Sequence, residues 1–134
     1  MIQVSVKCPK CGHSLMERGH KLDGKPSIKV DFSYSTKKGA LYLSSLYGSY
    51  AIEMPFEMPE HKVAAFRCPH CREDLKSSRK CDVCGAHMVA FDLKQGGQVQ
   101  ICSRKGCRKH VFEFSDFETE LEAFYKAYAT QLDA

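Results

Sequence analysis

The residues best able to do chemistry in this sequence are eight cysteines, which occur as four close pairs. Three pairs have the spacing Cys-x-x-Cys, which can place two sulfurs on the same side of a metal ion, and the fourth pair is wider. Zinc prefers four such ligands at the corners of a tetrahedron. The sequence therefore predicts two sites with two Zn²⁺ ions as cofactors, built from the pairs Cys8/Cys11, Cys68/Cys71, Cys81/Cys84 and Cys102/Cys107.

Metal ligation is favoured over disulfide bonding by the compartment that the chain is expected to occupy. The first ten residues, MIQVSVKCPK, lack the apolar core of a signal peptide. No apolar run approaches the ~18 residues that span a membrane. We therefore expect a cytoplasmic chain without membrane contact, whose cysteines stay reduced and bind metal. Four cysteines around one ion leave no open coordination position, so we predict structural sites and no enzymatic activity.

Spacing alone leaves open how the pairs combine. Residues 68–85, CPHCREDLKSSRKCDVCG, bring the second and third pairs close enough to share one ion, which would leave the first and fourth pairs for the other. Against this grouping, residues 87–94 and 98–102 read as two strands joined by a QGG turn, with a cysteine pair at each end of the hairpin. We therefore favour sequential grouping: Cys8, Cys11, Cys68 and Cys71 form site 1, and Cys81, Cys84, Cys102 and Cys107 form site 2.

This grouping makes residues 72–80, REDLKSSRK, a polar connector between two modules. The expected units are residues 1–75, a first zinc ribbon with an inserted β-meander, and residues 76–134, a second ribbon with a C-terminal helix.

The stretch CDVCGAHMVAFDLKQGGQVQICSRKGC, residues 81–107, resembles the zinc-ribbon superfamily, and within it the small zinc modules near the C-terminus of bacterial type IA topoisomerases. The likeness covers this stretch alone, so it implies a zinc module and no topoisomerase activity. The whole chain is similar to small, uncharacterised bacterial proteins with two zinc ribbons. The turns CPKCG and CDVCG also have the rubredoxin form. A rubredoxin-like iron protein that carries electrons is therefore the alternative metalloprotein.

The segment between the first two cysteine pairs is predicted to form an antiparallel β-meander over about residues 24–66. Residues 26–34, PSIKVDFSY, alternate between apolar and polar side chains, as a half-buried strand does. Residues 35–39 are a turn candidate, residues 40–54 a strand that Gly48 bends, and residues 62–66 a final strand.

The last segment changes its apolar period to that of a helix. Apolar residues recur at helical spacing from Phe117 to Leu132, and Ser115 is a suitable N-cap. These features predict an amphipathic helix over about residues 116–132. The expected fold class is therefore α+β, with two zinc ribbons, an inserted β-meander and this helix.

Charge suggests two kinds of partner. Residues 61–110 carry eleven Lys and Arg against four Asp and Glu, whereas residues 111–134 carry one against six. The basic block could bind nucleic acid through phosphate contacts, or could offset the negative charge of the metal-bound thiolates. We favour a protein-interaction or adaptor role with an unidentified protein partner. The alternative is a nucleic-acid-binding protein that uses Arg79, Lys80, Arg104, Lys105, Arg108 and Lys109.

Overall fold

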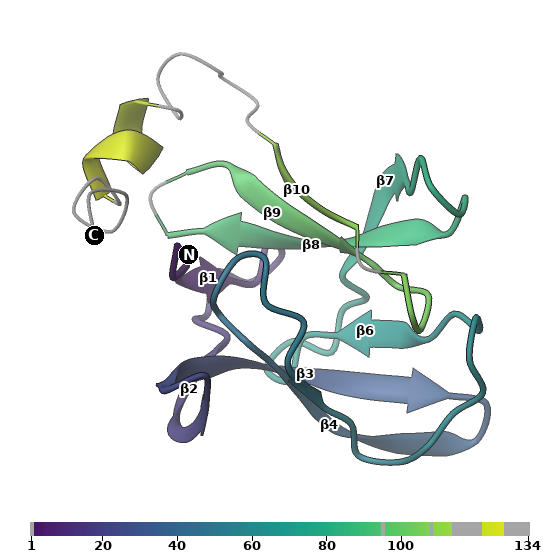
Figure 1. The fold of residues 1–134 in the computed structure, drawn as a ribbon. Coiled ribbons are helices and arrows are strands. Elements are labelled where there is room, and N and C mark those ends of the chain that lie inside the picture. The colour runs from purple at the N-terminus through teal and green to yellow at the C-terminus, as the bar shows by residue number, and fades with distance from the viewer. Residues whose placement is uncertain (1, 95, 108, 114–121, 128–134) are drawn as a thin grey trace.

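A computed structural model of the chain shows two β-sheets that pack face to face (Figure 1). The structure describes residues 2–94, 96–107, 109–113 and 122–127. Strands make up 48% of the structure and helix only 5%. The predicted α+β class is therefore wrong, because the described residues build a mostly β protein.

The first sheet contains the predicted meander. From Ile28 to Tyr34, β3 pairs with β4 on one side, while β2 and β6 pair with different parts of its other side. Alternation in β3 places Ile28, Val30 and Phe32 in the core, as the sequence predicts. Gly48 has a φ of 93° in the turn that separates β4 from β5. The strands are β2 (Met16–Leu22), β3 (Lys25–Tyr34), β4 (Lys37–Leu43), β5 (Ile52–Glu53) and β6 (Ala65–Arg67).

The second sheet is built around the predicted hairpin of β8 and β9. On the free side of β8, β1 pairs with one end of the strand and β7 with the other, while β10 pairs with β9. The expected connector at residues 72–80 is thus partly strand β7. Its sequence lacks strand alternation because its side chains are mostly exposed at the sheet edge. The strands are β1 (Val6–Lys7), β7 (Lys76–Lys80), β8 (His87–Leu93), β9 (Gln98–Cys102) and β10 (His110–Glu113).

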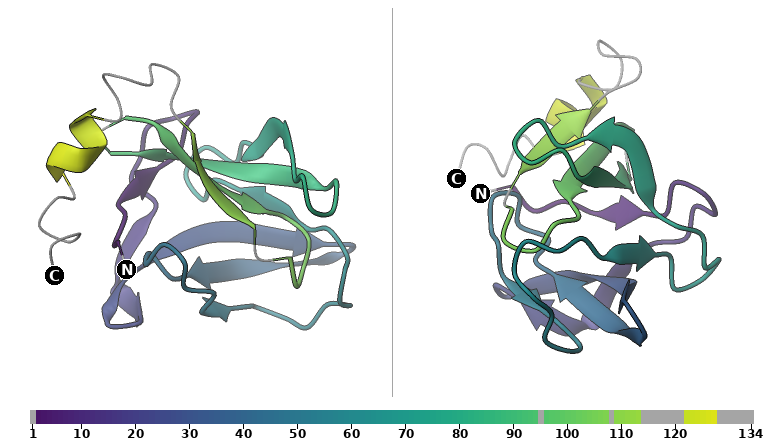
Figure 2. Two further views of the ribbon diagram at one scale, coloured as in Figure 1. Left: turned by 45° about the horizontal axis from the view of Figure 1, so that its top comes forward. Right: turned by 90° about the vertical axis from the view of Figure 1, so that its right-hand side faces the viewer.

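The chain passes between the two sheets twice. It leaves β1 in the second sheet and enters β2 in the first, and later it leaves β6 in the first sheet and returns to β7 in the second. The views in Figure 2 show the resulting two layers. Each passage contains one Cys-x-x-Cys turn, residues 8–11 and residues 68–71. The two turns of site 1 are therefore the connections between the layers.

One apolar core fills the space between the sheets and draws on both expected units. It includes Val30 and Leu41 of the first sheet together with Phe91 and Leu93 of the second. The phenyl rings of Phe32 and Phe66 meet edge to face with centroids 5.2 Å apart, where β3 and β6 pair. Because the core is shared, the two sheets stabilise each other.

Only part of the predicted C-terminal helix lies within the described residues. The described helix covers residues 122–127, and the remaining parts of the expected range 116–132 lie outside the described residues. Phe124 is only 6% exposed and belongs to the apolar core. This member of the predicted apolar stripe is thus a core residue rather than part of a docking face. No helix within the described residues has the length and apolar character to cross a membrane.

A close contact between Gly39 of β4 and Pro55 gives a test of this packing. A Cβ atom added at Gly39 would lie 2.4 Å from the Pro55 Cβ, and the proline ring cannot rotate away. We predict that G39A lowers the free energy of unfolding by about 1–3 kcal/mol, measured by thermal denaturation of the metal-loaded protein.

The double variant G39A/P55G should recover part of this loss, because glycine at position 55 lacks both the Cβ and the Cγ atoms that the added methyl group would meet. G19A is the control, since its added Cβ would meet only the Glu17 Oε1 atom at 3.4 Å. Equal losses in G39A and G19A would contradict the steric explanation.

Candidate metal centres

Site 1 gathers four cysteines from two turns that are far apart in sequence. Cys8 and Cys11 lie between β1 and β2, and Cys68 and Cys71 lie between β6 and β7. The Cys8 and Cys71 Sγ atoms are 3.8 Å apart, and those of Cys11 and Cys68 are 3.7 Å apart. All four Sγ atoms lie within 4.8 Å of one another.

This geometry fits a four-coordinate metal ion. Sulfurs bound at about 2.3 Å around a tetrahedral zinc ion are separated by about 3.8 Å, whereas disulfide-bonded sulfurs are about 2.05 Å apart. The donor set of four thiols and the measured separations therefore match a tetrahedral metal–thiolate site. The same donors suit zinc and iron, so geometry alone leaves the identity of the metal open.

The two turns of site 1 have the same backbone structure despite different sequences. The Gly12 amide donates to the Cys8 carbonyl, and the Arg72 amide donates to the Cys68 carbonyl, both at 2.9 Å. Gly12 has a φ of 77°, and Arg72 takes a similar left-handed conformation with a φ of 66°. For a non-glycine residue, the left-handed conformation costs about 1–2 kcal/mol of conformational free energy. The turn CPHCR thus keeps the geometry of CPKCG without its glycine.

Backbone amides in each turn point at the more buried sulfur. The amides of Lys10 and Cys11 lie 3.3 and 3.5 Å from the Cys8 Sγ atom. The amides of His70 and Cys71 lie at the same distances from the Cys68 Sγ atom. In the absence of metal, burial raises the pKa of Cys8 to about 12. Metal binding must therefore displace a proton from this thiol, and the amides then stabilise the thiolate.

Site 2 lies at the end of the second sheet. Cys81 and Cys84 form the turn between β7 and β8, while Cys102 and Cys107 flank the loop between β9 and β10. The Sγ atoms of Cys81 and Cys107 are 3.7 Å apart, and those of Cys84 and Cys102 are 3.4 Å apart. All four Sγ atoms again lie within 4.8 Å of one another. Site 2 therefore closes the β8–β9 hairpin.

Arg104 gives site 2 a cation that site 1 lacks among the described contacts. Interaction with the Cys84 side chain raises the pKa of its guanidinium, and its Nη1 atom donates to the His61 carbonyl at 2.6 Å. Hydrogen bonding from the Ala86 amide, aided by Arg104, lowers the pKa of Cys84 to about 6. Burial raises the pKa of Cys102 well above its usual range. Cys84 thus loses its proton more readily than Cys102.

The structure gathers the cysteines in the sequential grouping. Cys71 and Cys81 belong to different clusters, so the grouping that places the second and third pairs on one ion does not occur. The sequence analysis raised compensation of the thiolate charge as one role of the basic block, and the member of that block that interacts with Cys84 is Arg104. Its position two residues after Cys102 was the available signal, because side chains inside such a loop lie beside the metal ligands.

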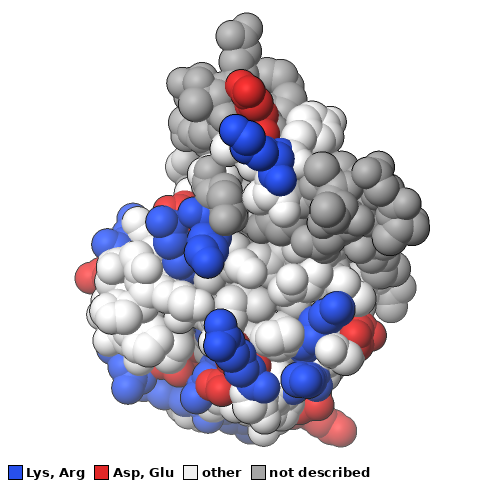
Figure 3. Space-filling model, turned by 90° about the vertical axis from the view of Figure 1, so that its left-hand side faces the viewer, with Lys and Arg blue, Asp and Glu red and all other residues white. Residues whose placement is uncertain are grey.

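Several residues proposed to contact nucleic acid have partners within the protein. Lys105 Nζ donates to the Met58 carbonyl at 2.8 Å and lies 3.0 Å from Glu60 Oε1. Lys109 Nζ lies 3.4 Å from Asp82 Oδ1. Arg79 and Lys80 are exposed on β7, and Arg108 lies outside the described residues. On the face in Figure 3, blue Lys and Arg are scattered among red Asp and Glu.

Comparison with protein-family models matches residues 16–133 to the family described as tRNA synthetases class I (M). No curated protein and no solved structure matches the chain. The two four-cysteine clusters fit sites of the zinc-ribbon kind. Membership of the zinc-ribbon superfamily and the likeness to type IA topoisomerase modules remain predictions, because the matching family model is a different one.

The contact between Arg104 and Cys84 predicts a difference between the two sites. Replacing Arg104 with glutamine removes a charge that stabilises the Cys84 thiolate, so site 2 should release its metal about 10-fold faster to a chromogenic chelator. Metal release from site 1 should be unaffected. The time course should therefore show a fast phase from site 2 and a slow phase from site 1.

R72Q is the matched control, because Arg72 pairs with Asp31 at 2.7 Å rather than with a sulfur. Unchanged release rates in R104Q, or equal acceleration in both variants, would contradict a specific role for Arg104.

Proposed function

The chain belongs to the family of class I tRNA synthetases (M), and from this starting point we propose that it is a non-enzymatic, zinc-binding adaptor protein. Its two metal ions hold the fold, and its surface binds a protein partner. The observation that carries the proposal is that each cluster places four cysteine sulfurs within 4.8 Å of one another, where they could hold one ion. Such a site leaves no coordination position for a substrate or a reacting water molecule.

Zinc is the metal that we propose for both sites. It accepts four thiolates in a tetrahedron without preferring any other geometry, and it has no redox chemistry that would oxidise its ligands. When bound, it would keep all eight thiols deprotonated and tie their turns together. We also propose a cytoplasmic location, since such thiols persist as ligands in a reducing compartment.

Elemental analysis should find two zinc ions per chain and a colourless protein. The double variants C11S/C71S at site 1 and C84S/C107S at site 2 should each retain one zinc ion in native mass spectrometry, because each removes two ligands from a single cluster. Visible absorption with stoichiometric iron would instead support the rubredoxin-like electron carrier and refute the zinc assignment.

The adaptor role is supported by the distribution of contacts on the surface. Among the six proposed nucleic-acid residues, Arg104, Lys105 and Lys109 contact groups of this chain. Tyr50 and Ile52 are 46% and 45% exposed and lie close together in the sequence, next to the edge of the first sheet. Aromatic residues are enriched at protein interfaces. We therefore propose Tyr50 and Ile52 as part of the face that meets a protein.

RNA binding is the second candidate function, and the family description is the observation that favours it, because it names tRNA synthetases. Arg79 and Lys80, both exposed on β7, would then supply phosphate contacts. Such contacts weaken steeply as the salt concentration rises, because the release of counterions from the nucleic acid then contributes less free energy to binding.

One capture experiment separates the two candidates. The tagged protein is used to capture partners from its native cell extract with and without ribonuclease, beside the variants Y50S/I52S and R79Q/K80Q. An adaptor should retain a protein partner after ribonuclease treatment and lose it in Y50S/I52S but not in R79Q/K80Q. V83S is the control for Y50S/I52S, because Val83 is 71% exposed on the turn of site 2.

The opposite pattern would refute the adaptor role in favour of RNA binding. In that case, capture would disappear with ribonuclease, weaken from low to moderate salt and depend on Arg79 and Lys80.

A further inference from the structure

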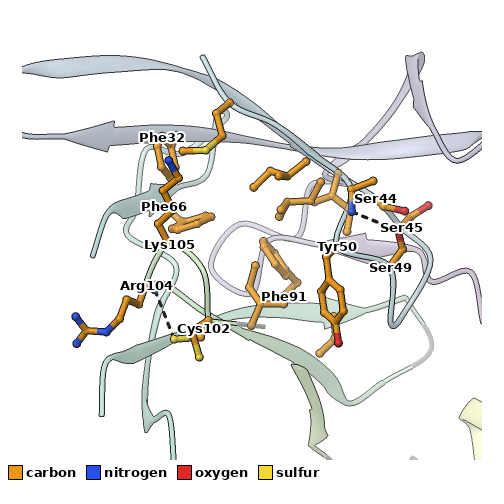
Figure 4. Close-up of a pocket in the computed structure, with 18 of the residues that line it drawn as sticks. Phe32, Ser44, Ser45, Ser49, Tyr50, Phe66, Phe91, Cys102, Arg104 and Lys105 are labelled. Atoms are coloured by element: carbon orange, nitrogen blue, oxygen red, sulfur yellow. Dashed lines mark hydrogen bonds between the residues drawn. The ribbon is translucent and has the colours of Figure 1, made fainter. Parts of the chain in front are cut away.

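A cavity of about 330 Å³ lies between the two sheets, on the side where the β4–β5 loop meets the site 2 loop. Its size falls within the range of about 300–1,000 Å³ that is typical of small-molecule sites. Figure 4 shows side chains from both sheets and from the β4–β5 loop converging on this space. Neither metal site uses it, although Cys102 and Cys107 of site 2 form part of its wall.

The floor of the cavity is apolar and well packed. Phe66 of β6, Phe91 of β8 and Val99 of β9 line it, and Phe91 is only 1% exposed. Toward solvent, the half-exposed side chains of Tyr50 and Ile52 form its rim. The aromatic rings of Phe66, Phe91 and Tyr50 come from β6, β8 and the β4–β5 loop. An aromatic molecule in this space would therefore contact a ring on more than one side.

Several polar side chains around the cavity are already engaged within the protein, although the buried Nε atom of Arg104 has no hydrogen-bond partner among the described residues. The hydroxyl groups of Ser44 and Ser49 both donate to Asp23 Oδ2 at 2.6 Å, and that of Ser45 donates to the Pro26 carbonyl at 2.7 Å. Lys105 contacts Met58 and Glu60. The guanidinium of Arg104 is directed away from Phe66 and Phe91 in Figure 4. A charged ligand would therefore lose its hydration without gaining a cation or a hydroxyl donor from these groups.

From these observations, we propose that the cavity is a binding site for a small, uncharged, largely apolar molecule that carries an aromatic ring. The site binds by burying apolar surface against Phe66, Phe91 and Val99, and its engaged polar rim excludes charged analogues. This binding activity goes beyond the adaptor role. It is tested with the purified protein alone, so its failure would leave the adaptor role untouched.

Two fluorescent probes of similar shape test the chemistry of the site. N-phenyl-1-naphthylamine is uncharged, whereas 8-anilino-1-naphthalenesulfonate adds a sulfonate to the same rings. The uncharged probe should bind the metal-loaded protein saturably at one site per chain, with at least 10-fold higher affinity than the sulfonate. Equal affinities, or absence of saturable binding by the uncharged probe, would overturn the proposal.

A pair of matched variants tests the location. A51F adds a phenyl group to a residue that lines the cavity, while V83F adds the same group to an exposed turn outside it. Affinity for N-phenyl-1-naphthylamine should fall at least 10-fold in A51F and stay unchanged in V83F, with two metal ions per chain in both. Unchanged affinity in A51F would overturn the assignment to this cavity.

Metal release from site 2 gives a further test that needs no variant, because the cavity and site 2 share part of their wall. Because Cys102 and Cys107 line the cavity, bound N-phenyl-1-naphthylamine should slow metal release from site 2 to a chelator and leave site 1 unchanged. Equal slowing at both sites would indicate a general effect of the probe and would contradict binding at this wall.

Discussion

The convergence of four sulfurs at site 1 is the constraint on which the rest of the structure depends. Both passages of the chain between the sheets run through this cluster, one at Cys8 and Cys11 and the other at Cys68 and Cys71. An ion bound there would fix the sheets relative to each other where the chain itself crosses. The shared core then packs between two sheets whose spacing is set at site 1. A chain of 134 residues has limited apolar surface to bury, so such a link contributes strongly to its stability.

Hydrogen bonds from the site 2 loop hold the segment that precedes β6 in the first sheet. The Lys105 amide donates to the Lys62 carbonyl at 2.9 Å, and the His61 amide donates to the Lys105 carbonyl at 3.2 Å. The Arg104 side chain contacts the His61 carbonyl from the same loop. Site 2 therefore stabilises more than its own hairpin, because its loop also anchors the segment that precedes β6. The cavity lies beside this junction.

Electrostatics explains much of the basic character of the central sequence. Four thiolates around a divalent ion leave a net charge of about −2, which is costly to bury without compensation. Backbone amides supply part of that compensation at Cys8 and Cys68, and Arg104 supplies part of it at Cys84. Lys109 pairs with Asp82 beside the same site. The basic block thus serves the metal sites as well as the surface.

The sequence by itself determined the metal ligands and the hairpin of site 2, because Cys-x-x-Cys spacing and strand alternation are local patterns. The alternation of residues 26–34 likewise predicted β3. The sequence did not reveal β7, whose exposed edge position leaves no apolar pattern, nor that Phe124 of the described helix packs into the core. Only the tertiary structure decided that both turns of site 1 cross between the sheets, that Arg104 reaches Cys84 and that a cavity lies between the layers. These features depend on contacts between residues far apart in the chain, which local periodicity does not encode.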